Sequence, residues 1–206
     1  MEIDVRDKVI QEVSPTIMVP RYSNLEFLSE TRHRFLVAND GLWIEAKSPW
    51  IHLVLPISNF QKFNLPYGVL KRVLKFRFDK IPFVFLDTFA LDSQKSLPTE
   101  HTAWILWDQK KEKLVYRDLK ILESGEGRVN FERPVLEEHE SLVADLHSHG
   151  NLSSFFSQQD DEDDRGELKI AGVLGRVGTN KQKWSFRLCA GGTFFQLPQR
   201  ICCFDC

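Results

Sequence analysis

Two histidines followed by a serine and an aspartate have the spacing of a metal-binding site. Residues 147–160 read HSHGNLSSFFSQQD. Side chains alternate between the two faces of a β-strand, so His147 and His149 would project from one face and Ser148 from the other. Catalytic zinc usually has three protein ligands and leaves a fourth position to water. A third ligand must then come from outside the strand, and Asp160 is the best candidate.

Ser157 and Asp160 also match the Ser-x-x-acid pattern that begins a helix. In such a capping box the serine would fix the direction in which the first helical turn points its acid. The acidic residues 161–163 are favoured at a helix N-terminus by the macrodipole, and we expect them to face solvent. Asp164, one turn beyond Asp160, is the reserve ligand. Each half of the motif also has an ordinary explanation, as half-buried histidines and as a simple helix cap.

The elements that would position these residues form a mixed α/β domain from about residue 81 to residue 200. Apolar spacing predicts a helix over 82–96, which Pro98 ends. Short helices are expected over 134–140 and from 157 to 166. Period-two patterning and turn residues predict strands over 102–108, 113–122, 141–149, 168–177, 184–190 and 193–197. The histidine pair would therefore end one strand, and the acid would begin the helix that follows.

The first 80 residues are predicted to form a separate strand-rich segment of unknown role. A hairpin is expected from 34–38 and 42–46, joined by the turn signal Asn39-Asp40-Gly41. An apolar run over 50–56 follows. The segment 69–78 could be a strand or a short helix, because periodicity does not separate the two.

Composition limits the class of protein. A net charge of −2 and a pI near 6.3 do not favour binding to a phosphate backbone, so no nucleic-acid partner is expected. The first residues, MEIDVRDKVIQEV, lack the apolar region of a signal peptide, and no run of about 18 apolar residues predicts a membrane span. We therefore expect a cytoplasmic protein.

The four cysteines do not form a disulfide framework. Three of them lie in a Cys-rich tail over 201–206, where reduced thiols are the expected state. A structural zinc site would have to use Cys189, Cys202, Cys203 and Cys206. Adjacent Cys202 and Cys203 fit poorly into the paired spacing of such sites.

The motif and an upstream glutamate together resemble the JAB1/MPN/Mov34 (JAMM) family of zinc metalloenzymes. The family pattern is a Glu in a Pro-x-Glu context before a strand, then His-(Ser/Thr)-His, seven residues, and Ser-x-x-Asp. This chain has Pro98-Thr99-Glu100, His147-Ser148-His149 and Ser157-Gln158-Gln159-Asp160 in that order. The resemblance covers about residues 83–197 and implies a JAB/MPN-like mixed sheet flanked by helices.

The resemblance implies a role for each matching residue. His147, His149 and Asp160 would bind Zn2+, with water as the fourth ligand. Glu100 would be the acid/base residue, and Ser157 would hydrogen-bond the developing oxyanion. The implied activity is that of a metallopeptidase or isopeptidase, which would hydrolyse an amide bond at the C-terminus of a ubiquitin-like protein or of its conjugates.

A narrower similarity is to bacterial members of PRTRC systems. It lies in Asp145-Leu146-His147-Ser148-His149-Gly150, in Phe155-Phe156-Ser157 and in Lys169-Ile170-Ala171-Gly172-Val173. Gly150 departs from the wider family, in which many members have Pro after the second histidine. We expect the glycine to loosen this loop.

Other interpretations use the same part of the chain. Glutamates in the segment 137–140 are nearer to the histidines than Glu100, but this charged segment is expected to face solvent. The Asp-x-His-x-His pattern also resembles PHP-type phosphoesterases, which need later histidines, and none of the six follows His149. A catalytically silent MPN-type scaffold or binding module stays the alternative function.

Overall fold

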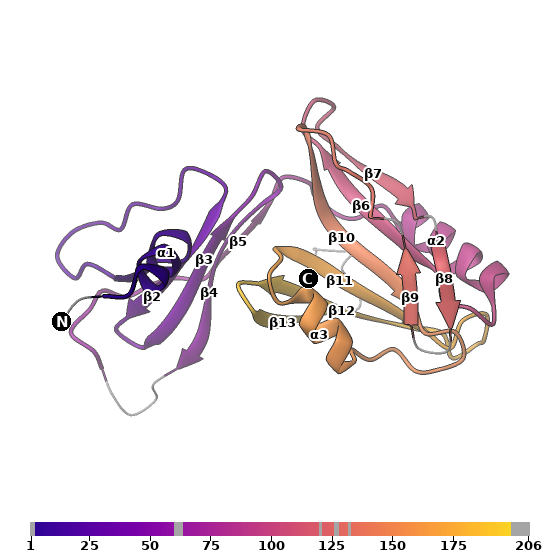
Figure 1. Ribbon diagram of the computed structural model, residues 1–206. Coiled ribbons are helices and arrows are strands. Elements are labelled where there is room, and N and C mark those ends of the chain that lie inside the picture. Colours follow the sequence, from indigo (N-terminus) through magenta and orange to yellow (C-terminus); the bar gives the residue numbers. More distant parts are fainter. Residues whose placement is uncertain (1–2, 60–63, 120, 126–127, 132, 199–206) are drawn as a thin grey trace. The chain divides into compact units, whose positions relative to one another are not determined.

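The computed structural model describes residues 3–59, 64–119, 121–125, 128–131 and 133–198. The cysteines expected in a tail over 201–206 lie outside these described residues. The chain divides into two units, Met1–Arg77 and Phe78–Cys206 (Figure 1).

Over residues 3–59 and 64–77, the first unit is a five-stranded sheet with one helix. The predicted hairpin is confirmed, because β2 and β3 pair antiparallel from Arg32 with Lys47 to Ala38 with Gly41. The ambiguous segment 69–78 contains a strand. The strands follow one another in the sheet as β1 (Thr16–Met18), β2 (Arg32–Ala38), β3 (Gly41–Lys47), β4 (Ile51–Asn59) and β5 (Val73–Phe76).

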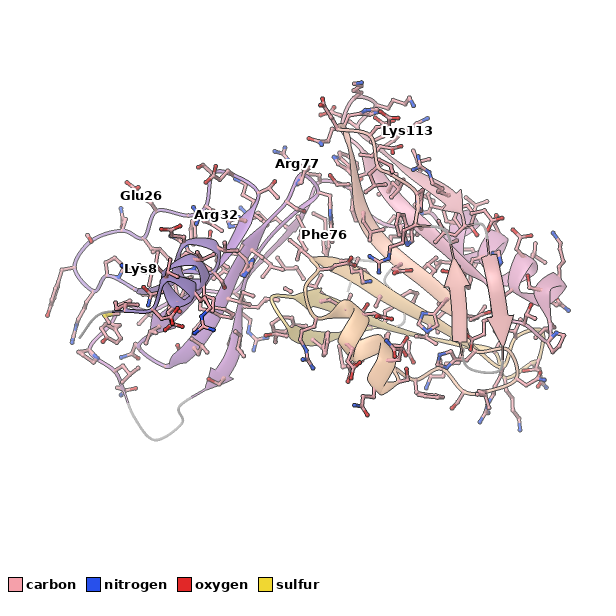
Figure 2. All side chains as sticks on the ribbon, in the orientation of Figure 1. Lys8, Glu26, Arg32, Phe76, Arg77 and Lys113 are labelled. Carbon is pink, nitrogen blue, oxygen red and sulfur yellow. The ribbon has the colours of Figure 1, made fainter. Side chains whose placement is uncertain are left out.

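The helix α1 (Val5–Val13) is a feature that the expected strand-rich segment did not include. The Asp4 side chain accepts a hydrogen bond from the Arg6 N–H and caps its start. Its end is attached to β2, where Arg32 donates to the Glu12 carbonyl at 3.0 Å. Lys8 in α1 and Arg32 in β2 are labelled in Figure 2. None of the α1 side chains is buried, so no apolar core stripe predicts this helix.

In its described residues the second unit contains a six-stranded mixed sheet, two helices and a separate β-hairpin. The predicted mixed α/β class is confirmed. The strands of the main sheet lie in the order β13 (Thr193–Leu197), β12 (Lys183–Ala190), β11 (Lys169–Gly175), β10 (Glu140–Ser148), β6 (Thr102–Asp108) and β7 (Lys113–Asp118).

Strands β10 and β11 form the parallel pair of this sheet. Parallel neighbours require a crossover connection, and here the crossover contains helix α3 (Gln158–Asp164). β10 is also paired antiparallel with β6, with His147 opposite Thr102. The C-terminal end of β10 therefore meets the start of β6 and the crossover that leads into α3.

Helix α2 (Phe83–Ser96) confirms the helix predicted over 82–96. Pro82 precedes it, and Pro98 cannot continue it because proline has no N–H to donate. Its buried side chain Phe89 contacts the rings of His101 and Trp184, at centroid distances of 5.2 and 5.3 Å. This packing attaches the segment before β6 to the sheet.

Two predicted elements are wrong. The short helix expected over 134–140 is irregular, because Glu140 begins β10 and its side chain accepts a hydrogen bond from the Glu137 N–H. The single strand expected over 113–122 is two strands. β7 ends at Asp118, and β8 (Ile121–Gly125) pairs with β9 (Arg128–Phe131) in a separate two-stranded sheet. Lys113, the first residue of β7, is labelled in Figure 2.

Candidate metal centre

Strand β10 directs the two histidines toward the same site. The ladder with β6 extends to His147 and the ladder with β11 to Ser148, so alternation of side chains applies up to the end of the strand. Ser148 is fully buried on the opposite side, where its hydroxyl accepts a hydrogen bond from the His101 N–H at 2.9 Å. Ser148 therefore has a structural role and fixes the start of the segment that leads into β6.

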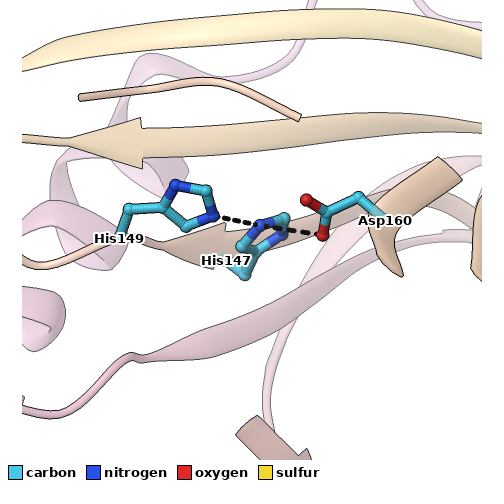
Figure 3. A group of neighbouring side chains, drawn as sticks. All are labelled: His147, His149 and Asp160. Carbon is cyan, nitrogen blue, oxygen red and sulfur yellow. Dashed lines mark hydrogen bonds and ion pairs between the residues drawn. The ribbon is translucent and has the colours of Figure 1, made fainter. Parts of the chain in front are cut away.

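His147, His149 and Asp160 converge, as Figure 3 shows. The two Nε2 atoms lie 3.1 Å apart, and the His147 Nε2 lies 3.3 Å from Asp160 Oδ1. One ligand atom from each residue lies within 4.8 Å of the others. Among the described residues, this is the group of three or more His, Cys, Asp and Glu side chains arranged to hold a metal ion.

The second imidazole is oriented by the loop that follows β10. Its Nδ1 lies 3.3 Å from the Ser153 carbonyl oxygen, which can only accept a hydrogen bond. Nδ1 therefore donates, and Nε2 keeps its lone pair directed toward the site. Burial, and then the neighbouring His147, lower the pKa of His149 below its ordinary value, which favours the neutral imidazole that a metal ligand needs.

The loop between His149 and Ser154 is attached to the end of β11. Backbone N–H groups of His149, Arg176 and Val177 donate to carbonyls across it at 2.7–2.8 Å. Gly150 has a φ of +51°, in the left-handed region that favours glycine, and its carbonyl accepts from the Val177 N–H. The expectation that Gly150 loosens this loop is therefore wrong, because the glycine allows a tight turn that is held at its carbonyl.

Ser157 and Asp160 form the predicted capping box of α3. The Ser157 hydroxyl oxygen accepts from the Asp160 N–H at 3.2 Å. Asp160 Oδ2 accepts from the Ser157 N–H at 2.6 Å and from its hydroxyl at 2.7 Å. The two carboxylate oxygens of Asp160 therefore have different partners. Oδ2 accepts hydrogen bonds from Ser157, and Oδ1 faces His147.

Glu100 lies on the loop between α2 and β6, two residues before Thr102. The next residue, His101, accepts a hydrogen bond at its carbonyl from the Ser148 N–H at 2.9 Å, which brings this loop to the end of β10 that carries His147. Burial, and then the negative charge of Asp160, raise the pKa of Glu100 to about 7. The effect of Asp160 on this pKa indicates that the two carboxylates share one site.

The other glutamates considered as bases lie elsewhere. Glu137 and Glu138 are exposed and precede the first residue of β10, whereas the histidines lie at its other end. Glu140 accepts a hydrogen bond from Arg117 at 2.6 Å. A strand of nine residues separates the two ends by roughly 25–30 Å, so these groups cannot reach the histidines.

Asp164 is not a reserve ligand, and this prediction is wrong. Its Oδ1 lies 2.8 Å from Lys169 Nζ and its Oδ2 lies 2.7 Å from Arg187 Nη2. Asp161 was expected to face solvent, but its carboxylate pairs with Arg187 as well. The sequence contained a signal for these contacts, because Lys169 directly precedes the apolar run of β11 and Arg187 lies between the apolar residues Phe186 and Leu188 of β12.

Cys189 is buried in β12, and its Sγ lies 3.5 Å from Asp164 Oδ2. Burial raises the pKa of this thiol to about 12. The other three cysteines of the conceivable structural zinc site lie outside the described residues.

No helix in the described part of the chain is long and apolar enough to cross a membrane.

Two family models match the chain. One, described as a domain of unknown function (DUF2016), matches residues 4–77. The other, described as prokaryotic homologs of the JAB domain, matches residues 84–189, which include Glu100, both histidines and Asp160. None of the curated proteins compared matches the chain. The narrower similarity to PRTRC-system members stays a prediction. Because the JAB model matches more than half of the sequence, the chain belongs to the family of prokaryotic JAB-domain homologs.

Proposed function

We propose that this protein is a zinc-dependent hydrolase that cleaves an amide bond, as a peptidase or isopeptidase. The observation that supports this proposal is the convergence of His147, His149 and Asp160 beside a glutamate whose pKa is about 7. Three convergent protein ligands with a neighbouring acid/base group are the arrangement that a metal-assisted hydrolase needs.

The donor atoms fit zinc. Two imidazole nitrogens and one carboxylate oxygen are ligands that Zn2+ accepts, whereas Mg2+ and Ca2+ prefer oxygen ligands alone. The His149 Nδ1 is engaged by the Ser153 carbonyl, which is the type of contact that orients metal-ligating histidines. His147, His149 and Asp160 would hold the ion, and three ligands leave a coordination position open.

Bound zinc would supply Lewis acidity, polarising the substrate carbonyl and lowering the pKa of a water molecule. Glu100 would accept a proton from the attacking water and deliver it to the departing amine. In the metal-free protein burial raises the pKa of Glu100, so this carboxylate binds a proton more readily than an exposed one would.

Ser157 would stabilise negative charge on the substrate carbonyl oxygen by donating its hydroxyl hydrogen. In the structure that hydrogen is directed to Asp160 Oδ2. A hydroxyl has one hydrogen to donate, so donation to substrate requires the hydroxyl to rotate away from Asp160. The Ser157 N–H, which donates to the same oxygen, can keep Asp160 in place meanwhile.

The substrate class follows from the resemblance to the JAMM family. We propose cleavage at the C-terminus of a ubiquitin-like protein or of its conjugates, in the cytoplasm and without a nucleic-acid partner. The chain's net charge of −2 is compatible with a protein substrate and offers no general attraction to phosphate backbones.

The test uses the whole 206-residue chain loaded with zinc, and a ubiquitin-like protein extended at its C-terminus by a short peptide. We expect cleavage that chelator abolishes and added zinc restores. His149→Ala should lose both cleavage and stoichiometric zinc, measured by mass spectrometry of the metal. The matched control is His139→Ala, which removes a half-buried histidine immediately before β10. Zinc-free protein, or zinc-loaded protein with no chelator-sensitive cleavage, would support the scaffold alternative instead.

A further inference from the structure

Arg187 is a buried cation on the sheet beneath α3. It lies in β12, where 3% of the residue is exposed. The ladder pairs it with Ala171 of β11, which pairs in turn with Asp145 of β10. Arg187 therefore lies on the same face as Asp145 and His147, the face toward which α3 directs Asp164.

The guanidinium group contacts the chain on both sides of the segment Ser157–Asp160. Before that segment, it stacks on the ring of Phe156 at 3.9 Å from the centroid. After it, Nη1 pairs with Asp161, while Nε and Nη2 donate to Asp164 Oδ2 at 3.1 and 2.7 Å. The guanidinium carbon also lies 4.0 Å from the centroid of a second ring, that of Phe194 in β13.

Lys169 connects the same helix to the strand of the histidines. Only 1% of this residue is exposed, and its Nζ lies 2.8 Å from Asp164 Oδ1. The same Nζ lies 3.0 Å from Asp145 Oδ2, two residues before His147 in β10. Asp164 is thus shared between Lys169 and Arg187, one on each carboxylate oxygen.

Helix α3 needs such contacts to keep a defined position. It has seven residues, QQDDEDD, and isolated helices of this length are not stable in water. Five of the seven side chains are acidic, so they repel one another when ionised. Opposite charge from the sheet is therefore required to hold the turn that includes Asp160 against β10.

We propose that Arg187, supported by Lys169, is a positioning residue that sets Asp160 and Ser157 relative to His147 and His149. This inference rests on the proposed function, because it concerns the geometry of the metal ligands. Arg187 contacts neither ligand directly. Arg187 acts through Phe156, which precedes the capping box, and through Asp161 and Asp164, which follow it.

A lysine cannot replace this arginine. The planar guanidinium donates in several directions and stacks between two rings, whereas a lysine ammonium is a compact point charge. Arg187→Lys keeps the positive charge but loses the stacking on Phe156 and at least one of the two acidic contacts. We expect the affinity for metal to fall by about 10–100-fold, as it does when residues that orient metal ligands without contacting the metal are replaced.

The experiment is a titration of the whole metal-free 206-residue chain with Co2+, followed by the visible absorption of the bound ion. Far-UV circular dichroism first establishes a temperature at which every variant is folded. A second variant, Asp161→Asn, removes one half-exposed partner of Arg187 and should fold normally; its affinity should fall several-fold. The matched control is Arg117→Lys, which alters a half-buried arginine paired with Glu140 in the same sheet.

Weaker Co2+ binding and an altered absorption band in Arg187→Lys and Asp161→Asn, with Arg117→Lys unchanged, would support the positioning role. Wild-type affinity in both folded variants would overturn it, even if their melting temperatures fall, because that result describes a merely structural contact. A wild-type protein that binds no Co2+ would overturn the proposed function as well, and the two failures are thereby distinguished.

Discussion

Replacing Glu100 by glutamine should stabilise the metal-free protein at neutral pH. Burial and the charge of Asp160 raise the pKa of this carboxyl from 4.5 to about 7. The folded state therefore binds the proton more tightly than the unfolded state. Its contribution to stability is fully present below pH 4.5 and is lost as the pH rises through 7. Glutamine has the same shape as a protonated glutamate but never becomes charged, so Glu100→Gln does not lose this stability as the pH rises.

The size of the effect follows from the pKa. A change from 4.5 to about 7 corresponds to about 3.4 kcal/mol, at 1.36 kcal/mol per pH unit. Glu100 is only half-buried, and solvent screening reduces the difference to about 1–2 kcal/mol. For a unit of this size, that free energy raises the melting temperature by roughly 3–6 °C.

The assay is scanning calorimetry of the metal-free protein between pH 5 and pH 8. The transition of the second unit is identified as the one that shifts when zinc is added. The melting temperature of Glu100→Gln should exceed that of the wild type increasingly as the pH rises. Glu138→Gln, at an exposed position, is the control and should show no such trend. A constant difference across this pH range would refute the electrostatic account of Glu100.

The same variant separates metal binding from proton transfer. Zinc-loaded Glu100→Gln should keep its metal, because Glu100 is not among the three convergent ligands. Loss of the proposed acid/base group should lower the cleavage rate by roughly 10²–10⁴-fold. Retained turnover in the zinc-loaded variant would indicate that another group transfers the proton.

Three further changes probe the surroundings of the site. His147→Ala removes the imidazole that lies between the other two ligands, so metal analysis should find less than stoichiometric zinc; full occupancy would contradict the proposed ligand set. Ser157→Ala removes the helix cap and the hydroxyl contact to Asp160, and should cost about 1 kcal/mol in urea unfolding together with weaker Co2+ binding. An unchanged unfolding midpoint would show that the cap is not needed. Gly150→Ala places a side chain at a φ of +51° and should lower stability by about 1–2 kcal/mol, whereas an unaltered melting temperature would mean that the turn relaxes freely.

Local patterns determined much of the candidate site. The alternation of side chains along a strand placed His147 and His149 on one face, and the Ser-x-x-Asp pattern predicted the capped start of α3. Both features depend on residues within a few positions of one another. The structure contains them as expected, and its hairpin over β2 and β3 was also predictable from a short turn signal.

Longer-range contacts were harder to predict. Asp164 forms ion pairs with Lys169 of β11 and Arg187 of β12. Helical spacing alone cannot reveal these partners, so it wrongly suggested that Asp164 is a metal ligand. A short helix was expected over 134–140, but Glu140 pairs with Asp108 of β6 and begins a strand instead. In both cases, a partner distant in the sequence outweighed the local preference.

By itself, the sequence determined which side chains of residues 147–160 can meet, because strand and helix periodicity act over short distances. Only the tertiary structure decided which distant groups join them. The pairing of β6 with β10 brings the loop that contains Glu100 to the end of β10, more than 45 positions further along the chain, and burial there raises the pKa of Glu100. The pairing of β12 with β11 places the buried Arg187 and Lys169 where they pair with acidic residues of α3. Sheet pairing and desolvation depend on the whole fold, and no local pattern specifies them.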